Sequence, residues 1–274
     1  MNRIHLFRLS KITFILILCL SSHAQGQVLI GPVVGGQLNW ISYKEQSSKD
    51  IYSTSPVYGF HAGFSVVFRT HKKFFMQTSL VYYQRGKSIT GIGDPTLIHK
   101  ASYNYLDLPI LFTREFNAKI GRNKFFKWYL GFGPNVSYWL GGTGYLKNSD
   151  LYENSINPPN NDITYSISFD KDRDSTPPDE MSIQNANRIQ LGLSFSAGLI
   201  FEPVGLNKFM ITARYELGGS YLSEESNGDF GNELGLVYTD DLQSRTNGFA
   251  LSLYYLIDLK TETRKKGKST LKIK

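Results

Sequence analysis

The chain has 274 residues, of which 41% are hydrophobic and 14% aromatic, with a formal net charge of +7 and a single cysteine. A chain of this length can bury a sizeable core, and one cysteine excludes an internal disulfide framework and a multi-thiolate metal site. The excess of basic residues lies at the two ends of the sequence. The charge therefore does not indicate a nucleic-acid-binding surface.

The first segment has the pattern of an export signal. Three basic residues precede the apolar run 12–20, and a small-x-small sequence follows at 22–24. The run is shorter than the roughly 20 apolar residues of a membrane-spanning helix, so residues 1–24 are predicted to be a secretory signal peptide. Lipid attachment at Cys19 is the alternative, but Leu18 is bulky where such a site expects a small residue.

Apolar residues alternate with small or polar ones in several later segments, which predicts strands with one apolar face. The alternation is clearest from Ile189 to Phe201, where the second face carries Gly192, Ser194 and Ser196. Such small residues suit the crowded interior of a narrow barrel whose outside meets lipid. The expected strands cover residues 28–40, 58–68, 74–85, 105–112, 128–138, 189–201, 209–217 and 249–259.

The expected connections between these strands alternate in length. Long connections are predicted near 41–56, 88–101, 140–185 and 222–245, and short ones near 70–73, 115–125 and 202–207. Outer-membrane barrels have this rhythm, with short turns in the periplasm, and aromatic residues near both ends of the strands suit two membrane interfaces. Residues 25–260 are therefore predicted to form an all-β, eight-stranded antiparallel transmembrane up-and-down β-barrel in the bacterial outer membrane, followed by a basic periplasmic tail at 261–274.

Two soluble folds are alternatives to this prediction. A β-sandwich would place the aromatic residues in an ordinary core. A lipocalin-like barrel would keep its apolar face inside, but the Gly-x-Trp pattern that such barrels often carry is matched only with the wrong spacing, from Gly36 to Trp40. The combination of composition, aromatic placement and loop rhythm favours the membrane barrel.

Six charged residues fall on the inward face of the expected strands, and we expect them to pair across a closed lumen. They are Asp107, Arg114, Lys127, Arg214, Glu216 and Asp258. The three histidines of the mature chain, His61, His71 and His99, have no Ser or Asp signature beside them, so we predict no catalytic residue and no cofactor site.

Acidic residues gather in the two largest predicted loops. Residues 170–174 imitate the start of a calcium-binding loop, but Ser175 and Met181 replace the required glycine and glutamate, so no metal site is predicted. The loops are either solvated or bridged by divalent cations to lipopolysaccharide. The basic tail is either a solvated terminus or a contact for a periplasmic partner.

Two segments carry a resemblance to a known family. The sequences Tyr105-Leu-Asp-Leu-Pro-Ile-Leu-Phe112 and Gly131-Phe-Gly-Pro-Asn-Val-Ser-Tyr138 resemble paired strands of PorT-like outer-membrane β-barrel proteins of Bacteroidota. The first strand at 31–36 and the last at 254–256 are similar as well. Some members of that family are linked to type IX protein secretion, and the resemblance brings no catalytic residue.

The expected function is a non-enzymatic outer-membrane scaffold or accessory of envelope or secretion machinery. Its expected partners are outer-membrane lipid, lipopolysaccharide and proteins of that machinery, and not nucleic acid. One alternative is an enzyme that acts on lipid or lipopolysaccharide, and a second is a loop-based adhesin or ligand binder.

Overall fold

The computed structural model describes the barrel and parts of its connections: residues 27–71, 73–120, 124–148, 162–171, 176–177, 179–202, 207–223, 227–230 and 240–259. Within these residues, no helix is both long and apolar enough to cross a membrane. The signal peptide (1–24) and the basic tail (261–274) fall outside the described residues and stay predictions.

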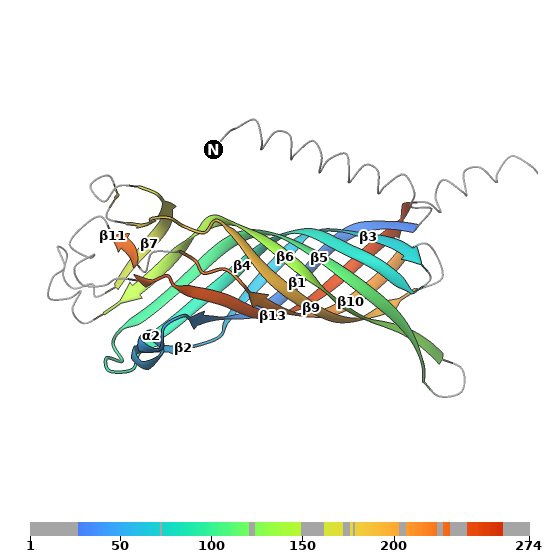
Figure 1. Cartoon of the computed structure of the whole chain (residues 1–274), viewed down its shortest axis with the longest axis horizontal. Coiled ribbons are helices and arrows are strands. Elements are labelled where there is room, and N and C mark those ends of the chain that lie inside the picture. Colours follow the sequence, from blue (N-terminus) through green and yellow to red (C-terminus); the bar gives the residue numbers. More distant parts are fainter. Residues whose placement is uncertain are drawn as a thin grey trace, which may run out of the picture.

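Eight strands form a closed ring, as predicted (Figure 1). Each strand pairs antiparallel with the next, and the last closes on the first from Leu29 opposite Asp258 to Tyr43 opposite Ser244. Around the ring the strands are β1 (Gln27–Tyr43), β3 (Val57–His71), β4 (Phe74–Gly91), β5 (Ile98–Ile120), β6 (Lys124–Lys147), β9 (Ile189–Phe201), β10 (Asn207–Gly218) and β13 (Ser244–Asp258).

The sheet continues beyond the ring at one end, which we call the long-connection end (Figure 1). There β7 (Asp162–Phe169) pairs with β6, β8 (Glu180–Ile183) runs parallel to β7, β11 (Asn227–Phe230) pairs with β8, and β12 (Asp240–Asp241) pairs with β11. The short helix α2 (Gln46–Ile51) and β2 (Tyr52–Thr54), which pairs with β4, lie at the same end. The opposite, short-turn end has the connections β3–β4, β5–β6 and β9–β10.

Several predicted loops are wrong, because strands β4, β5 and β6 are longer than their alternation suggests. Most of the expected loop 88–101 belongs to β4 and β5, most of the expected turn 115–125 belongs to β5 and β6, and residues 140–147 belong to β6. Main-chain pairing continues there while polar residues occupy both faces, so the hydropathy pattern fades although the strand does not.

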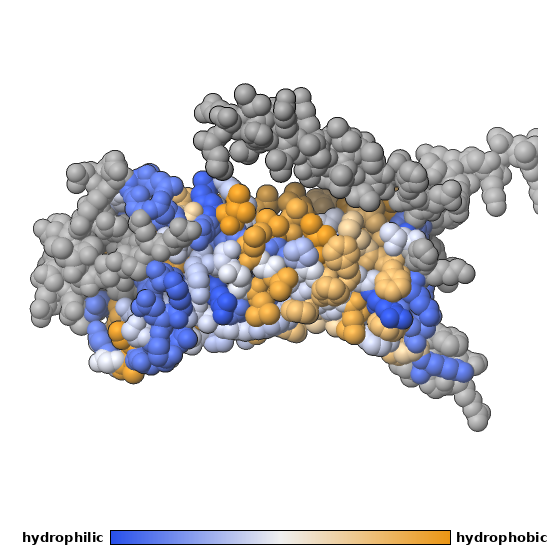
Figure 2. All heavy atoms as spheres, in the orientation of Figure 1, coloured by the Kyte–Doolittle hydropathy of each residue, from blue (hydrophilic) through white to orange (hydrophobic). Residues whose placement is uncertain are grey.

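The two faces of the wall agree with the predicted alternation. Outward side chains such as Phe64, Phe132 and Leu193 are 67%, 63% and 53% exposed, whereas Ser194 is fully buried inside. Figure 2 shows apolar residues gathered over the middle of the barrel, with polar residues toward its ends. This is the inverse of a soluble barrel, whose apolar face is inside.

A bulge in β6 changes which residues face inward. The β5–β6 register shifts between Asn104 and Tyr105, opposite Gly141, whose φ of 145° favours glycine. Before the bulge Trp139 faces inward, and beyond it Gly144 and Leu146 do. The bulge therefore shifts the inward-facing positions of β6 from odd to even residue numbers.

The predicted aromatic belt at the long-connection end is partly wrong. Tyr82 and Tyr138 lie on the outer face, but Tyr83, Tyr103 and Trp139 are fully buried inside. Trp139 packs edge-on against Tyr103, with ring centroids 5.3 Å apart. These rings fill the part of the lumen nearest the long-connection end and do not lie at a membrane interface. Neighbouring residues on a strand face opposite sides, so Tyr83 points inward while Tyr82 points outward.

Candidate functional site in the barrel lumen

A buried network of four charges crosses the middle of the lumen. Arg85 Nη2 on β4 lies 2.6 Å from Asp107 Oδ2 on β5 and 3.2 Å from Glu216 Oε2 on β10. Arg214, also on β10, pairs with Glu216 Oε1 at 2.7 Å and donates a hydrogen bond to the Tyr83 hydroxyl at 3.0 Å. Two guanidinium groups thus neutralise two carboxylates across the barrel.

Aromatic rings hold these guanidinium groups in place. The Arg85 guanidinium lies 4.6 Å from the ring centroid of Tyr105 and 5.1 Å from that of Tyr83, and the Arg214 guanidinium lies 5.5 Å from Tyr83. A cation over a ring face gains electrostatic stabilisation, most when water is excluded. The guanidinium groups, their carboxylate partners and the aromatic rings are therefore packed together as one layer.

His61 occupies its own polar cluster beside this layer. Its Nδ1 lies 2.9 Å from Gln37 Oε1, its Nε2 lies 2.8 Å from Ser252 Oγ, and its ring stacks on Tyr83 at 4.9 Å. Both ring nitrogens are engaged by neutral side chains. This arrangement orients the imidazole but supplies no carboxylate partner of the kind that a Ser–His–Asp triad uses.

A second charged network lies at the short-turn end. Arg69 pairs with Glu115 at 2.8 Å, and Glu202 receives Lys127 at 2.6 Å and Lys208 at 2.9 Å. Partial burial of the Glu202 carboxylate raises its pKa, but the hydrogen bonds from the two lysines outweigh burial and lower the pKa to about 2. This network ties β3, β5, β6 and β10 together below the packed layer.

A third cluster ties the upper sheet to the barrel above the apolar band. Lys87 of β4 forms a buried ion pair with Asp240 of β12, and His99 Nδ1 lies 3.6 Å from the same carboxylate. The other ring nitrogen of His99 is 2.5 Å from the hydroxyl of Tyr165 on β7. Burial, and secondarily Lys87, lowers the His99 pKa to about 4 although Asp240 opposes the shift.

Four of the six charged residues predicted to face inward are buried in the lumen: Asp107, Arg214, Glu216 and Asp258. Lys127 is partly exposed and joins the network at the short-turn end. The prediction for Arg114 is wrong. It has the same parity as Phe112, and the structure places it on the outer face.

Sequence reasoning missed several partners of these residues. Arg85 is the last residue of the expected strand 74–85, in which the adjacent Phe74 and Phe75 obscure the two faces. Lys87 follows that strand, just before the expected loop 88–101, and Asp240 lies in the expected loop 222–245. His99, also expected in a loop, is fully buried on β5. His71 ends β3, and the description of the structure does not extend to its side chain. Side chains alternate along a strand, so Arg85 and Lys87 face the same side as Tyr83. Counting from an inward Tyr83 would have placed both of them inside.

The arrangement of the lumen side chains fits a role in closing the lumen better than a role in catalysis. The cavity beside Arg85, Ser137 and Glu216 has a volume of about 20 Å³, room for about one water molecule. Within the described residues, no group of three or more His, Cys, Asp or Glu side chains could hold a metal ion. The charged groups of the central layer are bound to one another, so the middle of the barrel is a packed plug.

Several solved structures are distantly similar to the chain. OprG from Pseudomonas aeruginosa is 12% identical, with 86% of this chain and 97% of that chain covered and a TM-score of 0.47. Ail, the attachment invasion locus protein of Yersinia pestis, solved in complex with the heparin analogue sucrose octasulfate, is 11% identical over 85% and 99% of the two chains, with a TM-score of 0.34. Neisserial surface protein A is 9% identical over 85% and 97%, with a TM-score of 0.33.

No curated protein matches the chain. The family model described as outer membrane protein beta-barrel domain matches residues 23–220, which is more than half of the sequence. That family is consistent with the closed ring and the apolar outer face. The chain therefore belongs to the outer membrane protein beta-barrel domain family, and its location is the bacterial outer membrane.

Proposed function

We propose that the protein is a non-enzymatic scaffold of the bacterial envelope that anchors an interaction surface in the outer membrane. The observation that carries this proposal is the packed charged layer formed by Arg85, Asp107, Arg214 and Glu216. A lumen filled in this way leaves the long-connection end as the place for function. Short turns face the periplasm in bacterial barrels, so the long-connection end is assigned to the cell surface.

The sheet above the ring supports an interaction role. Strands β7, β8, β11 and β12 extend the barrel wall beyond the apolar band, and the Lys87–Asp240 ion pair anchors β12 to β4. Rigid main-chain pairing gives a partner a preformed surface, which lowers the entropy cost of binding. A role in type IX secretion, as in some PorT-like proteins, is the specific form of this proposal.

The test is cross-linking and affinity purification of the full chain from outer membranes of its own host. A variant in which a short Gly-Ser linker replaces residues 162–183 removes β7 and β8, and a matched control carries a tag of similar size in the β3–β4 turn. We expect envelope proteins to co-purify with the wild type and the control but not with the linker variant. Recovery of no stable partner with the wild type would contradict the scaffold role.

The secretion role is tested separately, by comparing the secreted proteins of a deletion strain with those of its parent. Loss of type IX cargo from the medium is the expected result. Unchanged secretion together with a stable envelope partner would refute the secretion role and leave the scaffold in place.

The extended sheet also favours a second function, a loop-based adhesin or ligand binder. The same linker variant distinguishes the two by the source of the partner. An adhesin would bind host or surface molecules added from outside to whole cells, and it would lose that binding without residues 162–183, while purification from the envelope would recover no partner.

A further inference from the structure

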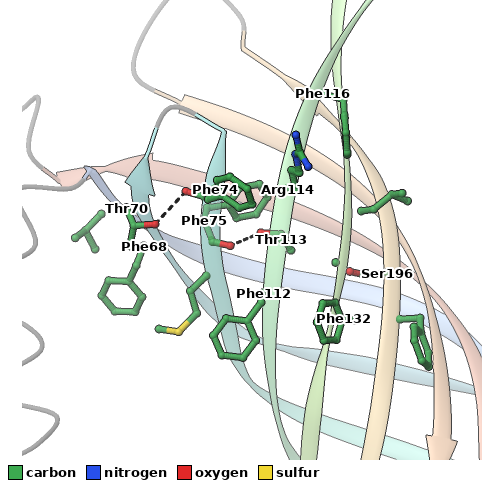
Figure 3. Close-up of a pocket in the computed structure, with 15 residues that line it drawn as sticks. Phe68, Thr70, Phe74, Phe75, Phe112, Thr113, Arg114, Phe116, Phe132 and Ser196 are labelled. Atoms are coloured by element: carbon green, nitrogen blue, oxygen red, sulfur yellow. Dashed lines mark hydrogen bonds between the residues drawn. The ribbon is translucent and has the colours of Figure 1, made fainter.

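The outer wall of the barrel has a groove near its short-turn end (Figure 3). The groove has a volume of about 1260 Å³ and crosses the outward faces of β3, β4, β5, β6 and β9. Its wall is largely aromatic: Phe68, Phe74, Phe112, Phe132 and Phe195 all contribute. In the outer membrane this surface meets lipid, so acyl chains are the natural content of the groove.

Arg114 lies at the edge of the groove and on the outer face of the wall. Its guanidinium is 5.4 Å from the ring centroid of Phe74 and 5.4 Å from that of Phe116, which itself stacks on Trp128 at 4.5 Å. Figure 3 shows Arg114 between these two phenylalanines, beside the groove. The exposed Arg114 side chain is thus held against two aromatic rings on the outer face.

Arg114 has no acidic partner among the residues that the structure describes. This differs from Arg85 and Arg214 in the lumen, and from Arg69 at the same end of the barrel, each of which pairs with a carboxylate. The neighbouring Lys73 is also exposed, and the sequence contains no Asp or Glu at 70–73 or 119–124. This edge of the barrel is therefore electropositive.

The position of Arg114 fits the level of lipid headgroups. It lies opposite Phe74, the first residue of β4, where the apolar band ends at the short turn. Arginine at such an interface is far less costly than at the midplane, and its planar donors suit two oxygens of a phosphate. Basic residues at a membrane surface attract anionic headgroups, and the leaflet on the periplasmic side is made of phospholipid.

We propose that Arg114 and the groove form a binding site for one phospholipid of the periplasmic leaflet. The guanidinium binds the phosphodiester, and an acyl chain lies against Phe112 and Phe132. The phosphate supplies the negative charge that the protein itself does not place beside Arg114. This site is on the outer wall, so it is independent of the scaffold role assigned to the opposite end.

Native mass spectrometry of the delipidated full chain in detergent tests the site, with dioleoyl phosphatidylglycerol as the probe. Arg114→Gln should weaken binding about fivefold or more, which corresponds to about 1 kcal/mol for one basic residue at an anionic surface. Arg245→Gln is the matched control, because Arg245 is also exposed but lies at the long-connection end of β13. Phe132→Ala should weaken binding while it leaves the arginine in place.

Two further probes separate the headgroup from the chain. Dioleoylglycerol lacks the phosphate and glycerol 3-phosphate lacks the chains, so both should bind much more weakly than the phospholipid. Equal binding of phosphatidylglycerol by Arg114→Gln and wild type would overturn the proposal, as would an equal loss in Arg245→Gln. Retention of either partial probe as strongly as the phospholipid would overturn it as well. Circular dichroism and heat-dependent gel mobility confirm that each variant is folded.

Discussion

The middle of the barrel and its short-turn end differ in how they hold charged side chains. In the middle, Arg85 and Asp107 are enclosed in the lumen and paired, and the outer face at that height is apolar. At the short-turn end, charged groups such as Glu202 are partly exposed and have several partners. The contrast shows that surrounding polarity decides where a charge can lie, because burial removes hydration that only a close opposite charge replaces.

The largest expected effect is the loss of a central partner. Arg85→Met leaves Asp107 fully buried without its cation and should destabilise the barrel by about 3–5 kcal/mol. The double variant Arg85→Met/Asp107→Leu should recover much of this loss, because it removes the unpaired charge. Urea unfolding in lipid vesicles measures both variants. A single variant as stable as wild type would mean that the central layer is not held by charge pairing.

The second prediction concerns a charge introduced on the lipid-facing side of the barrel wall. Leu193→Arg puts an unpaired cation in the middle of the lipid-facing surface, which should cost about 2–4 kcal/mol and impair insertion. Ser194→Ala, one residue away but facing the lumen, should change stability little. The two variants are compared by folding yield into vesicles. Equal insertion of Leu193→Arg and wild type would show that the assignment of faces is wrong.

The alternation that places Leu193 outside and Ser194 inside was readable from the sequence, and so were the eight strands of the ring. Alternation needs one apolar face, so it fails where β4 and β5 rise above the apolar band with Lys87 and His99 pointing inward. Strands β8, β11 and β12 have at most four residues each, which is too few for a clear alternation. Strand β7 does alternate, with Ile163, Tyr165 and Ile167 on one parity, but it lies within the expected loop 140–185 and was missed.

The central network was only partly predictable from the sequence. Parity places Asp107, Arg214 and Glu216 inside, but it does not tell which of them meet, since that depends on closure of β13 on β1 and on the stagger of the strands. Arg114 shows the opposite limit. Its charge suggested a position in the lumen, whereas the alternation counted from Phe112 places Arg114 on the outer face, as in the structure.

The third prediction concerns the cluster at the long-connection end. The His99 pKa is near 4 in the folded protein and 6.5 ordinarily, so only the unfolded segment binds a proton between these values. Stability of this end should therefore fall as the pH drops from 6.5, by about 1 kcal/mol at a pH of about 5.5. Hydrogen exchange of β12 and the adjoining part of β4 should show this loss in wild type and much less of it in His99→Gln. An identical pH profile in both proteins would contradict the assignment.

The smallest effect is expected at the short-turn end. Glu202 is 32% exposed, so Glu202→Gln should cost less than about 1 kcal/mol at neutral pH, because water already screens its pairs with Lys127 and Lys208. Its folded pKa is near 2 against an ordinary 4.5, so its contribution is present above 4.5 and is lost as the pH falls toward 2. Unfolding of both proteins over this range should show the difference between them vanish. A cost at neutral pH as large as that of Arg85→Met would mean that exposure does not separate the short-turn end from the middle, because both sites pair carboxylates with basic side chains and differ chiefly in their access to water.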